Sequence, residues 1–164
     1  MKWPDSPTIA EAREVQEHLR RRVKVVPSRR EPRYAAGVDA AFSDDTVYAA
    51  ACLYQYPDLS LVEQVHAVRK LRFPYVPGFL SFREGPAIIE AIQKLKQGPD
   101  VLLVDGQGIA HPRGIGIASF LGVLLDVPSI GCAKTRLVGE FREPGKKKGS
   151  WSELEYEDNV VGAD

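Results

Sequence analysis

Two aspartates interrupt or end apolar runs of this chain in a pattern that suits metal-ion chemistry. Asp39 lies inside YAAGVDAAF, residues 34–42, and Asp105 directly follows the apolar run VLLV at 101–104. A carboxylate is expensive to bury unless a cation meets it. Its oxygens are hard ligands that suit Mg²⁺ or Mn²⁺ better than zinc. Asp39 could instead accept backbone amides in a bulge, and Asp105 could cap the turn before Gly106.

Three further side chains could take part in such chemistry. Glu84 could work beside the two aspartates, or it could complete a capping box that begins at Ser81. His111 lies in a glycine-rich loop six residues after Asp105, where it could touch a substrate or hydrogen-bond its own loop. Lys134 could reach a phosphate group as a point charge, or it could extend along the surface. The residues alone leave these alternatives open.

The segment FPYVPGF, residues 73–79 and here called the PYVP loop, is stiff and apolar. Pro74 and Pro77 fix φ on both sides of Tyr75 and Val76, so the tip loses little entropy when it is pushed into another molecule. Apolar wedges of this kind separate bases in a duplex, and an aromatic ring stacks on a base that becomes exposed. The alternative is a tight turn whose tyrosine packs on the core.

Apolar periodicity predicts helices and strands that could bring the two aspartates together. The predicted elements, in chain order, are a helix at 6–22, strands at 34–42, 46–54 and 61–68, a helix through 88–95, a strand at 101–104, a helix at 114–125 and a strand at 128–132. Short links between the first three strands favour antiparallel neighbours, and the later order is typical of βαβ crossovers. We therefore expect an α/β fold, a mixed β-sheet flanked by helices in the element order of the ribonuclease H-like fold. If the first and fourth strands are neighbours, Asp39 and Asp105 converge on one spot.

The last part of the chain, residues 134–164, has a different character. The stretch 141–151 includes GKKKGS and predicts a hairpin with a basic tip, and VVGAD at 160–164 is typical of the start of a strand. Cys52 and Cys132 lie in apolar runs without Cys-x-x-Cys spacing, so we expect two small core residues rather than a zinc site.

Length and composition indicate one globular domain. The chain has 164 residues, 44% of them hydrophobic, and its 22 basic and 22 acidic side chains give a formal net charge of zero. Net charge therefore does not point to a nucleic-acid partner, although the basic residues of the first 33 could contact phosphates or form a solvated helix face. The uncharged runs are shorter than the roughly 20 residues of a membrane span. Because the N-terminus also lacks a secretory h-region, we expect a cytoplasmic protein without membrane contact.

Four segments taken together resemble the endonuclease V family of inosine-directed nucleases, which has a ribonuclease H-like fold. The segments are YAAGVDAAF, FPYVPGFLSFREGP, VLLVDGQGIAHPRGIGIASFLGV and GCAKTRLVG, and they follow one another in the family's order. The resemblance extends from about Ser6 to Trp151.

The resemblance implies a role for each candidate residue. The catalytic residues, which would also hold Mg²⁺ or Mn²⁺, would be Asp39, Glu84 and Asp105. The wedge that separates the strands would consist of Pro74, Tyr75, Val76 and Pro77. The base pocket, which is largely main chain in the family, would be formed by Gly78, Leu80, Gly106 and Ile117. His111 and Lys134 match family positions near the scissile bond.

The resemblance also implies an activity, that of a Mg²⁺-dependent endonuclease in DNA repair. The partner would be DNA, or RNA, that contains deaminated adenine. The enzyme would cut one nucleotide beyond that base on its 3′ side and leave a 3′-hydroxyl and a 5′-phosphate. No obligate protein partner is indicated.

The family pattern continues beyond Asp164 with a further strand, a helix and an active-site histidine. We therefore expect residues 1–164 to form a single endonuclease V-like domain that is C-terminally incomplete relative to the family. One alternative is a catalytically impaired fragment that still binds inosine. Another is a different ribonuclease H-like nuclease, such as a junction resolvase, which would share the acidic residues but have no use for the PYVP loop.

Overall fold

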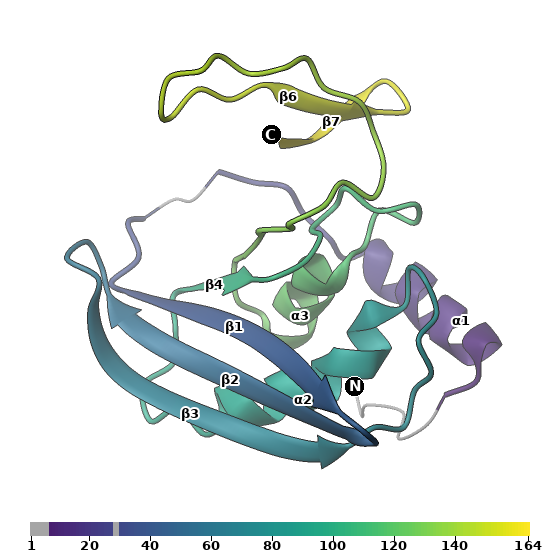
Figure 1. Ribbon diagram of the computed structural model, residues 1–164, viewed down its shortest axis with the longest axis vertical. Coiled ribbons are helices and arrows are strands. Elements are labelled where there is room, and N and C mark those ends of the chain that lie inside the picture. Colours follow the sequence, from purple (N-terminus) through teal and green to yellow (C-terminus); the bar gives the residue numbers. More distant parts are fainter. Residues whose placement is uncertain (1–6, 28–29) are drawn as a thin grey trace.

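A five-stranded mixed sheet forms the centre of the computed structural model, which describes residues 7–27 and 30–164 (Figure 1). Its strands are β1 (Tyr34–Ser43), β2 (Thr46–Gln55), β3 (Ser60–Lys70), β4 (Val101–Val104) and β5 (Ser129–Gly131). Their spatial order is β3-β2-β1-β4-β5. The first three strands form an antiparallel meander, whereas β4 is parallel to β1 and β5 is parallel to β4. The predicted α/β class, mixed sheet and ribonuclease H-like element order are confirmed.

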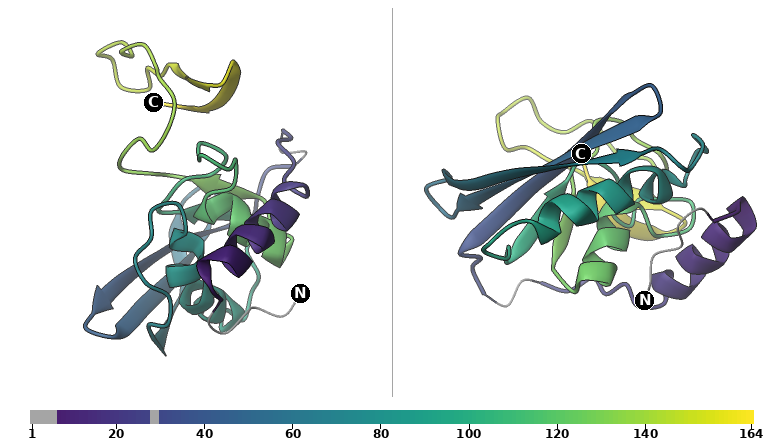
Figure 2. Two further views of the ribbon diagram at one scale, coloured as in Figure 1. Left: turned by 90° about the vertical axis from the view of Figure 1, so that its right-hand side faces the viewer. Right: turned by 90° about the horizontal axis from the view of Figure 1, so that it is seen from below.

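The alternation of side chains along β2 explains how the sheet forms its core. Val47, Ala49, Ala51 and Leu53 are buried on one face, because side chains two residues apart in a strand lie on the same side. That face is covered by α2 (Leu80–Gln93) and α3 (Ile117–Leu125), as Figure 2 shows. The two helices therefore stand between the sheet and α1 (Ile9–Arg20).

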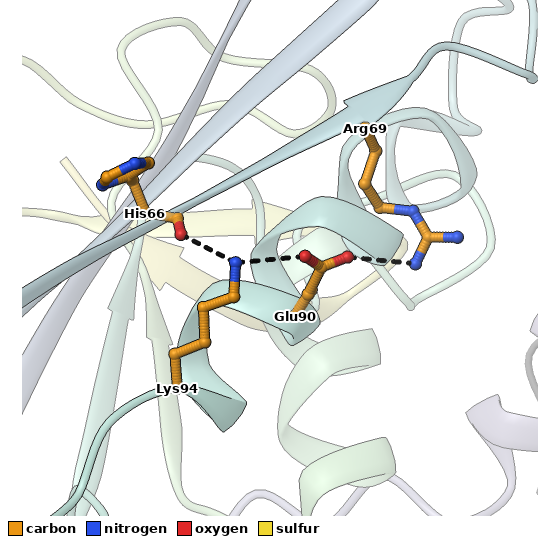
Figure 3. A network of polar contacts seen from close by, with 4 residues as sticks. All are labelled: His66, Arg69, Glu90 and Lys94. Carbon is orange, nitrogen blue, oxygen red and sulfur yellow. Dashed lines mark hydrogen bonds and ion pairs between the residues drawn. The ribbon is translucent and has the colours of Figure 1, made fainter.

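A polar network fastens the C-terminal half of α2 to β3 (Figure 3). The Glu90 carboxylate lies 3.5 Å from an Arg69 nitrogen and 3.2 Å from the Lys94 ammonium. Lys94 also donates a hydrogen bond of 3.1 Å to the backbone carbonyl of His66. These side chains are partly exposed, so the network contributes more to the position of α2 than to stability.

A second core cluster joins α1 to the PYVP loop and to α3. Its buried members are Ala12, Leu19, Phe73, Phe79, Phe82, Ile115 and Phe120. Helix α1 begins with a capping box in which Thr8 and Glu11 satisfy each other's backbone amides. The helix start expected at Ser6 lies outside the described residues, and within them the cap is Thr8.

The hairpin near the C-terminal end lies later in the chain than the sequence indicates. Strands β6 (Glu153–Tyr156) and β7 (Asn159–Ala163) form a separate two-stranded antiparallel sheet. The turn falls at Glu157 and Asp158, which both have positive φ. The prediction of a hairpin at 141–151 is wrong, because the segment between Phe141 and Trp151 contains Pro144 and two glycines and pairs with no strand of the described chain.

The two cysteines do not both lie in the core. Cys132 is exposed and Cys52 half-buried, so the prediction of two core thiols is wrong for Cys132. Cys132 follows directly after β5, a three-residue strand at one end of the sheet.

Among the helices that the structure describes, none is long and apolar enough to cross a membrane.

Candidate functional site

Adjacent parallel strands bring Asp39 and Asp105 together. Val38 of β1 pairs in register with Val104 of β4, so the residue that follows each valine is one of the two aspartates. The Asp105 amide donates a hydrogen bond of 3.3 Å to the Val38 carbonyl. The convergence expected from the sequence is therefore present in the fold, and its cause is the β1–β4 pairing.

The structure has neither a bulge at Asp39 nor a capping box at Glu84, the two structural roles considered for these acids. Asp39 accepts a hydrogen bond of 2.7 Å from the Ala40 amide, but β1 pairs with β2 without a bulge at this point. Glu84 does not complete a capping box with Ser81, because α2 begins at Leu80 and Phe79, its N-cap, makes no side-chain cap. The carboxylate of Glu84 instead faces the same cavity as the two aspartates.

Glu84 is a buried acid whose pKa is raised. Its side chain lies in the first half of α2 and the residue is only 8% exposed. Burial, followed by the charges of Asp39 and Asp105, raises the pKa of Glu84 to about 7, while Arg83 acts in the opposite direction. A cation placed beside the three carboxylates would favour the ionised form of Glu84.

Lys134 supplies one such positive charge. It lies after β5 and its ammonium group forms a hydrogen-bonded ion pair with Asp105 Oδ2. The hydrogen bond and the charge of Asp105 raise the pKa of Lys134. The lysine side chain is largely exposed, so it can leave the aspartate without disturbing the core.

The donor chemistry of the site fits a divalent metal better than its present arrangement does. Asp39, Glu84 and Asp105 offer the hard oxygen ligands that Mg²⁺ or Mn²⁺ prefers. Within the described ranges, no group of three His, Cys, Asp or Glu side chains is arranged to hold a metal ion. In this arrangement Asp105 is paired with Lys134, so the aspartate would have to exchange the ammonium for the metal.

A cavity of about 560 Å³ unites the acidic residues with the PYVP loop. Every candidate residue from the sequence lies on its wall. They are Asp39, Pro74, Tyr75, Val76, Pro77, Gly78, Leu80, Glu84, Asp105, Gly106, His111, Ile117 and Lys134. The wall is therefore apolar and main-chain-rich beside the PYVP loop and acidic at β1, β4 and α2.

The PYVP loop combines an exposed tip with a buried base. Tyr75 is 72% exposed, so the alternative in which this ring packs on the core does not apply. Phe73 and Phe79, at the two ends of the loop, are buried with their ring centroids 6.3 Å apart. Phe82 packs 5.5 Å from Phe73, measured between centroids. Because both ends are anchored, the tip projects from a fixed base.

Gly106 allows the loop after β4 to lie close to α3. It has a φ of +148°, and a Cβ at this position would lie 2.4 Å from the Cγ2 atom of Ile117. Only glycine permits both this backbone conformation and this approach. Asp105 and the N-terminal residue of α3 are thereby held on one wall.

His111 is buried and hydrogen-bonded within the protein. Its Nδ1 accepts from the Arg113 amide at 3.1 Å, so the proton is on Nε2, which lies 3.1 Å from the Gly78 carbonyl oxygen. Burial, followed by the charge of Arg113, lowers the pKa of His111 to about 4. At neutral pH the imidazole is thus uncharged and holds Gly78 in place.

Two residues near this histidine were missed from the sequence. Gln16 is fully buried on α1, and Arg113 follows the histidine by two residues. The available signal for Gln16 is its place on the apolar stripe of the helix between Ala12 and Leu19, where a polar residue is unexpected. Arg113 had no comparable signal, because an arginine in a polar loop is ordinary.

Comparison with known proteins gives consistent matches along the chain. A family model described as Endonuclease V matches residues 17–164. Endonuclease V from Roseiflexus sp. (strain RS-1) is 47% identical over 161 residues, which are 98% of this chain and 72% of that protein. The chain therefore spans about 72% of the length of this relative.

Solved structures of similar proteins have the same fold. The crystal structure of Endonuclease V from Streptomyces avermitilis is 41% identical with a TM-score of 0.90, and the match covers 98% of this chain and 72% of that one. A Ciona intestinalis Endonuclease V, in complex with a 23mer DNA containing an inosine followed by a ribo-adenosine, is 31% identical. Its TM-score is 0.72, and the match covers 80% of this chain and 59% of that one.

Proposed function

This chain belongs to the endonuclease V family, and we propose that it is a divalent-metal-dependent endonuclease that recognises deoxyinosine in DNA. We infer a cut one nucleotide beyond the deaminated base on its 3′ side, with a 5′-phosphate as one product. The observation that carries this proposal is the single cavity that the PYVP loop shares with Asp39, Glu84 and Asp105. A wedge and a hydrolytic centre on one wall suit an enzyme that opens a duplex and cuts beside the opening.

The apolar half of the cavity suits recognition of an extruded base. Deaminated adenine pairs poorly, so its extrusion costs less than that of a normal base. Tyr75 would stack in the gap that the base leaves, because the ring is exposed and its loop is anchored. Gly78, Leu80, Gly106 and Ile117 line the part where backbone amides can approach the base edge.

The acidic half of the cavity suits hydrolysis of a phosphodiester. Asp39 and Asp105 would hold Mg²⁺, or Mn²⁺, where the parallel pairing of β1 with β4 ends. The bound metal would activate water and stabilise the leaving oxygen. Glu84, which lines the same cavity, would ligate the metal or orient the nucleophile. Lys134, released from Asp105, would meet a phosphate oxygen.

The test is cleavage of an end-labelled duplex that contains one deoxyinosine, in the presence of Mg²⁺. The matched substrate carries adenine at the same position, and the matched protein is Asp105→Asn, which keeps the side-chain shape and removes the charge. We expect a product cut one nucleotide 3′ of inosine, from the inosine duplex alone and absent with the variant. An RNA version of the same strand determines whether the sugar matters.

A second candidate function is inosine-selective binding without turnover. It is favoured by the ion pair between Lys134 and Asp105, together with the lack of a ready three-ligand metal group among the described residues. Selective binding with no cut in Mg²⁺ or Mn²⁺ would support this candidate. Cleavage of branched junctions without preference for inosine would overturn both functions and favour a resolvase.

A further inference from the structure

The backbone carbonyl of Gly78 is the acceptor for three different side chains. Gln16 Nε2 donates to it at 2.9 Å, Arg113 donates through a terminal guanidinium nitrogen at 2.5 Å, and His111 Nε2 lies at 3.1 Å. A carbonyl oxygen has two lone pairs, so three donors saturate it. The Gly78 carbonyl is therefore fully used inside the protein and is not free to read a base.

The donors are also fixed relative to one another. Gln16 Oε1 accepts a hydrogen bond of 2.6 Å from Arg113 Nε, and the Arg113 guanidinium lies 4.2 Å from the centroid of the Phe79 ring. The Arg113 amide in turn donates to His111. Gln16, Gly78, His111 and Arg113 thus form a closed set of contacts, here called the Gly78 network.

The Gly78 network lies at the joint between the PYVP loop and α2. Gly78 has a φ of +79°, and a Cβ there would lie 2.7 Å from an Arg113 guanidinium nitrogen. The glycine stands three residues after Tyr75 and six before Glu84. The backbone conformation of Gly78 therefore sets where the exposed ring of Tyr75 lies relative to the acidic half of the cavity.

Gln16 reaches this joint from α1, which lends no side chain to the cavity wall among the described residues. It is fully buried, and both ends of its amide are used, one by Gly78 and one by Arg113. A buried amide that is satisfied at both ends fixes its partners with directional contacts that an apolar side chain cannot supply.

We propose that Gln16 is a positioning residue for base recognition, which acts by holding the Gly78 carbonyl and Arg113 so that the PYVP loop keeps one conformation. Helix α1 thereby belongs to the recognition machinery although it does not contact the cavity. The anchoring of the loop stands on the contacts alone, whereas the effect on recognition rests on the proposed function.

The test combines three variants. Gln16→Leu removes both hydrogen bonds at similar volume. Gln16→Glu keeps an acceptor for Arg113 but, when ionised, has no donor for Gly78. Glu14→Gln, on the exposed face of the same helix, is the matched control. One readout is hydrogen exchange of backbone amides in residues 74–82 without DNA, and the other is the ratio of Kd values for adenine and inosine duplexes in EDTA.

We expect Gln16→Leu to speed exchange in residues 74–82 and to lower the selectivity ratio, each by about tenfold, since a buried donor loses its partner. Exchange in β1 and β2 should stay unchanged, and Gln16→Glu should fall between Gln16→Leu and the wild type. If Gln16→Leu does not fold, Gln16→Glu carries the test by itself. Exchange and selectivity equal to those of Glu14→Gln would overturn the proposal. A wild type without inosine preference would instead refute the proposed function, while exchange would still test the anchoring.

Discussion

At the scale of single residues, two buried titratable groups on the cavity wall have pKa values displaced in opposite directions. Burial and two neighbouring carboxylates raise the pKa of Glu84 from 4.5 to about 7. Burial and Arg113 lower the pKa of His111 from 6.5 to about 4. The first group favours the folded state when it is protonated and the second when it is neutral, so their effects on stability oppose each other.

This opposition predicts a pH dependence that appears only when one group is removed. Between pH 4.5 and 6.5 the folded state keeps a proton on Glu84 that the unfolded state releases, and lacks a proton on His111 that the unfolded state binds. The two contributions to the slope of unfolding free energy cancel. With Glu84→Gln in EDTA, stability should rise by about 1.4 kcal/mol per pH unit over this interval. With His111→Gln it should fall by about as much.

Urea denaturation at several pH values would measure both slopes. The wild type should be nearly flat over the same interval because its two contributions cancel. Parallel profiles for the wild type and both variants would contradict the displaced pKa values.

The Lys134 ammonium pairs with Asp105, so the lysine competes with any metal ion for that carboxylate. Lys134→Met should bind Mn²⁺ severalfold more tightly without DNA, as measured by calorimetry or by the loss of the free-ion signal in electron paramagnetic resonance. Lys134→Arg keeps the charge and should resemble the wild type. Unchanged or weaker metal binding by Lys134→Met would argue against competition.

At the scale of elements, the PYVP loop has a buried base and an exposed tip, and the proposed function assigns the wedge to the tip. Tyr75→Ala should leave the unfolding free energy within about 0.5 kcal/mol, because the ring is exposed. It should weaken selective binding of inosine DNA by roughly 1–3 kcal/mol, the usual contribution of stacking a base on an aromatic ring. Gel-shift titrations with inosine and adenine duplexes would measure the loss. Tyr75→Phe is the control, and full selectivity in Tyr75→Ala would refute the wedge.

Gly116, the N-cap of α3, packs closely against Gln107 in the loop that follows Asp105. A Cβ at Gly116 would lie 2.2 Å from the Gln107 carbonyl oxygen, whereas a Cβ at Gly37 meets no atom within 4 Å. Gly116→Ala should therefore lower the unfolding free energy by about 1–3 kcal/mol, and Gly37→Ala should not. Thermal unfolding by circular dichroism would compare them. Equal midpoints would mean that the loop moves freely away from α3.

At the scale of the whole molecule, the formal net charge is zero, so long-range attraction to DNA depends on where the basic residues gather. Lys146, Lys147 and Lys148 lie together on an exposed loop between Lys134 and the β6–β7 sheet. The ribbon places that sheet apart from the helices and the central sheet (Figure 1). Such a loop can meet phosphates of the duplex flanking the cut without touching the lesion.

Replacing the three lysines of this loop by Gln should weaken binding to inosine and adenine duplexes by the same factor. The slope of log K against log salt should become shallower by up to about 0.9 for each lost phosphate contact. Fluorescence anisotropy at several salt concentrations would measure both effects. Lys96→Gln, at an exposed position three residues beyond the C-terminal end of α2, is the control. A change in selectivity for inosine would mean that these lysines act on the lesion itself.

The sequence by itself determined the strands of the central sheet and singled out the acidic residues as candidates. Alternating apolar side chains in 46–54 and the run VLLV are strand patterns that local sterics and burial enforce, and both strands form where predicted. The connection rules permitted the pairing of β1 with β4 without requiring it, and the pairing accounts for the meeting of Asp39 and Asp105. The misplaced hairpin shows the limit of local signals, since turn residues at 145–149 and at 157–159 compete and pairing partners decide between them.

Only the tertiary structure decided which polar groups are buried and what they contact. Gln16 is 62 residues from Gly78 in sequence, and no pattern links a helix stripe to a carbonyl in a distant loop. The neutral state of His111 and the raised pKa of Glu84 arise from burial and from charges on other elements. Local sequence fixes backbone preferences over a few residues, whereas desolvation and hydrogen-bond partners depend on packing between distant segments, and packing exists only in the folded chain.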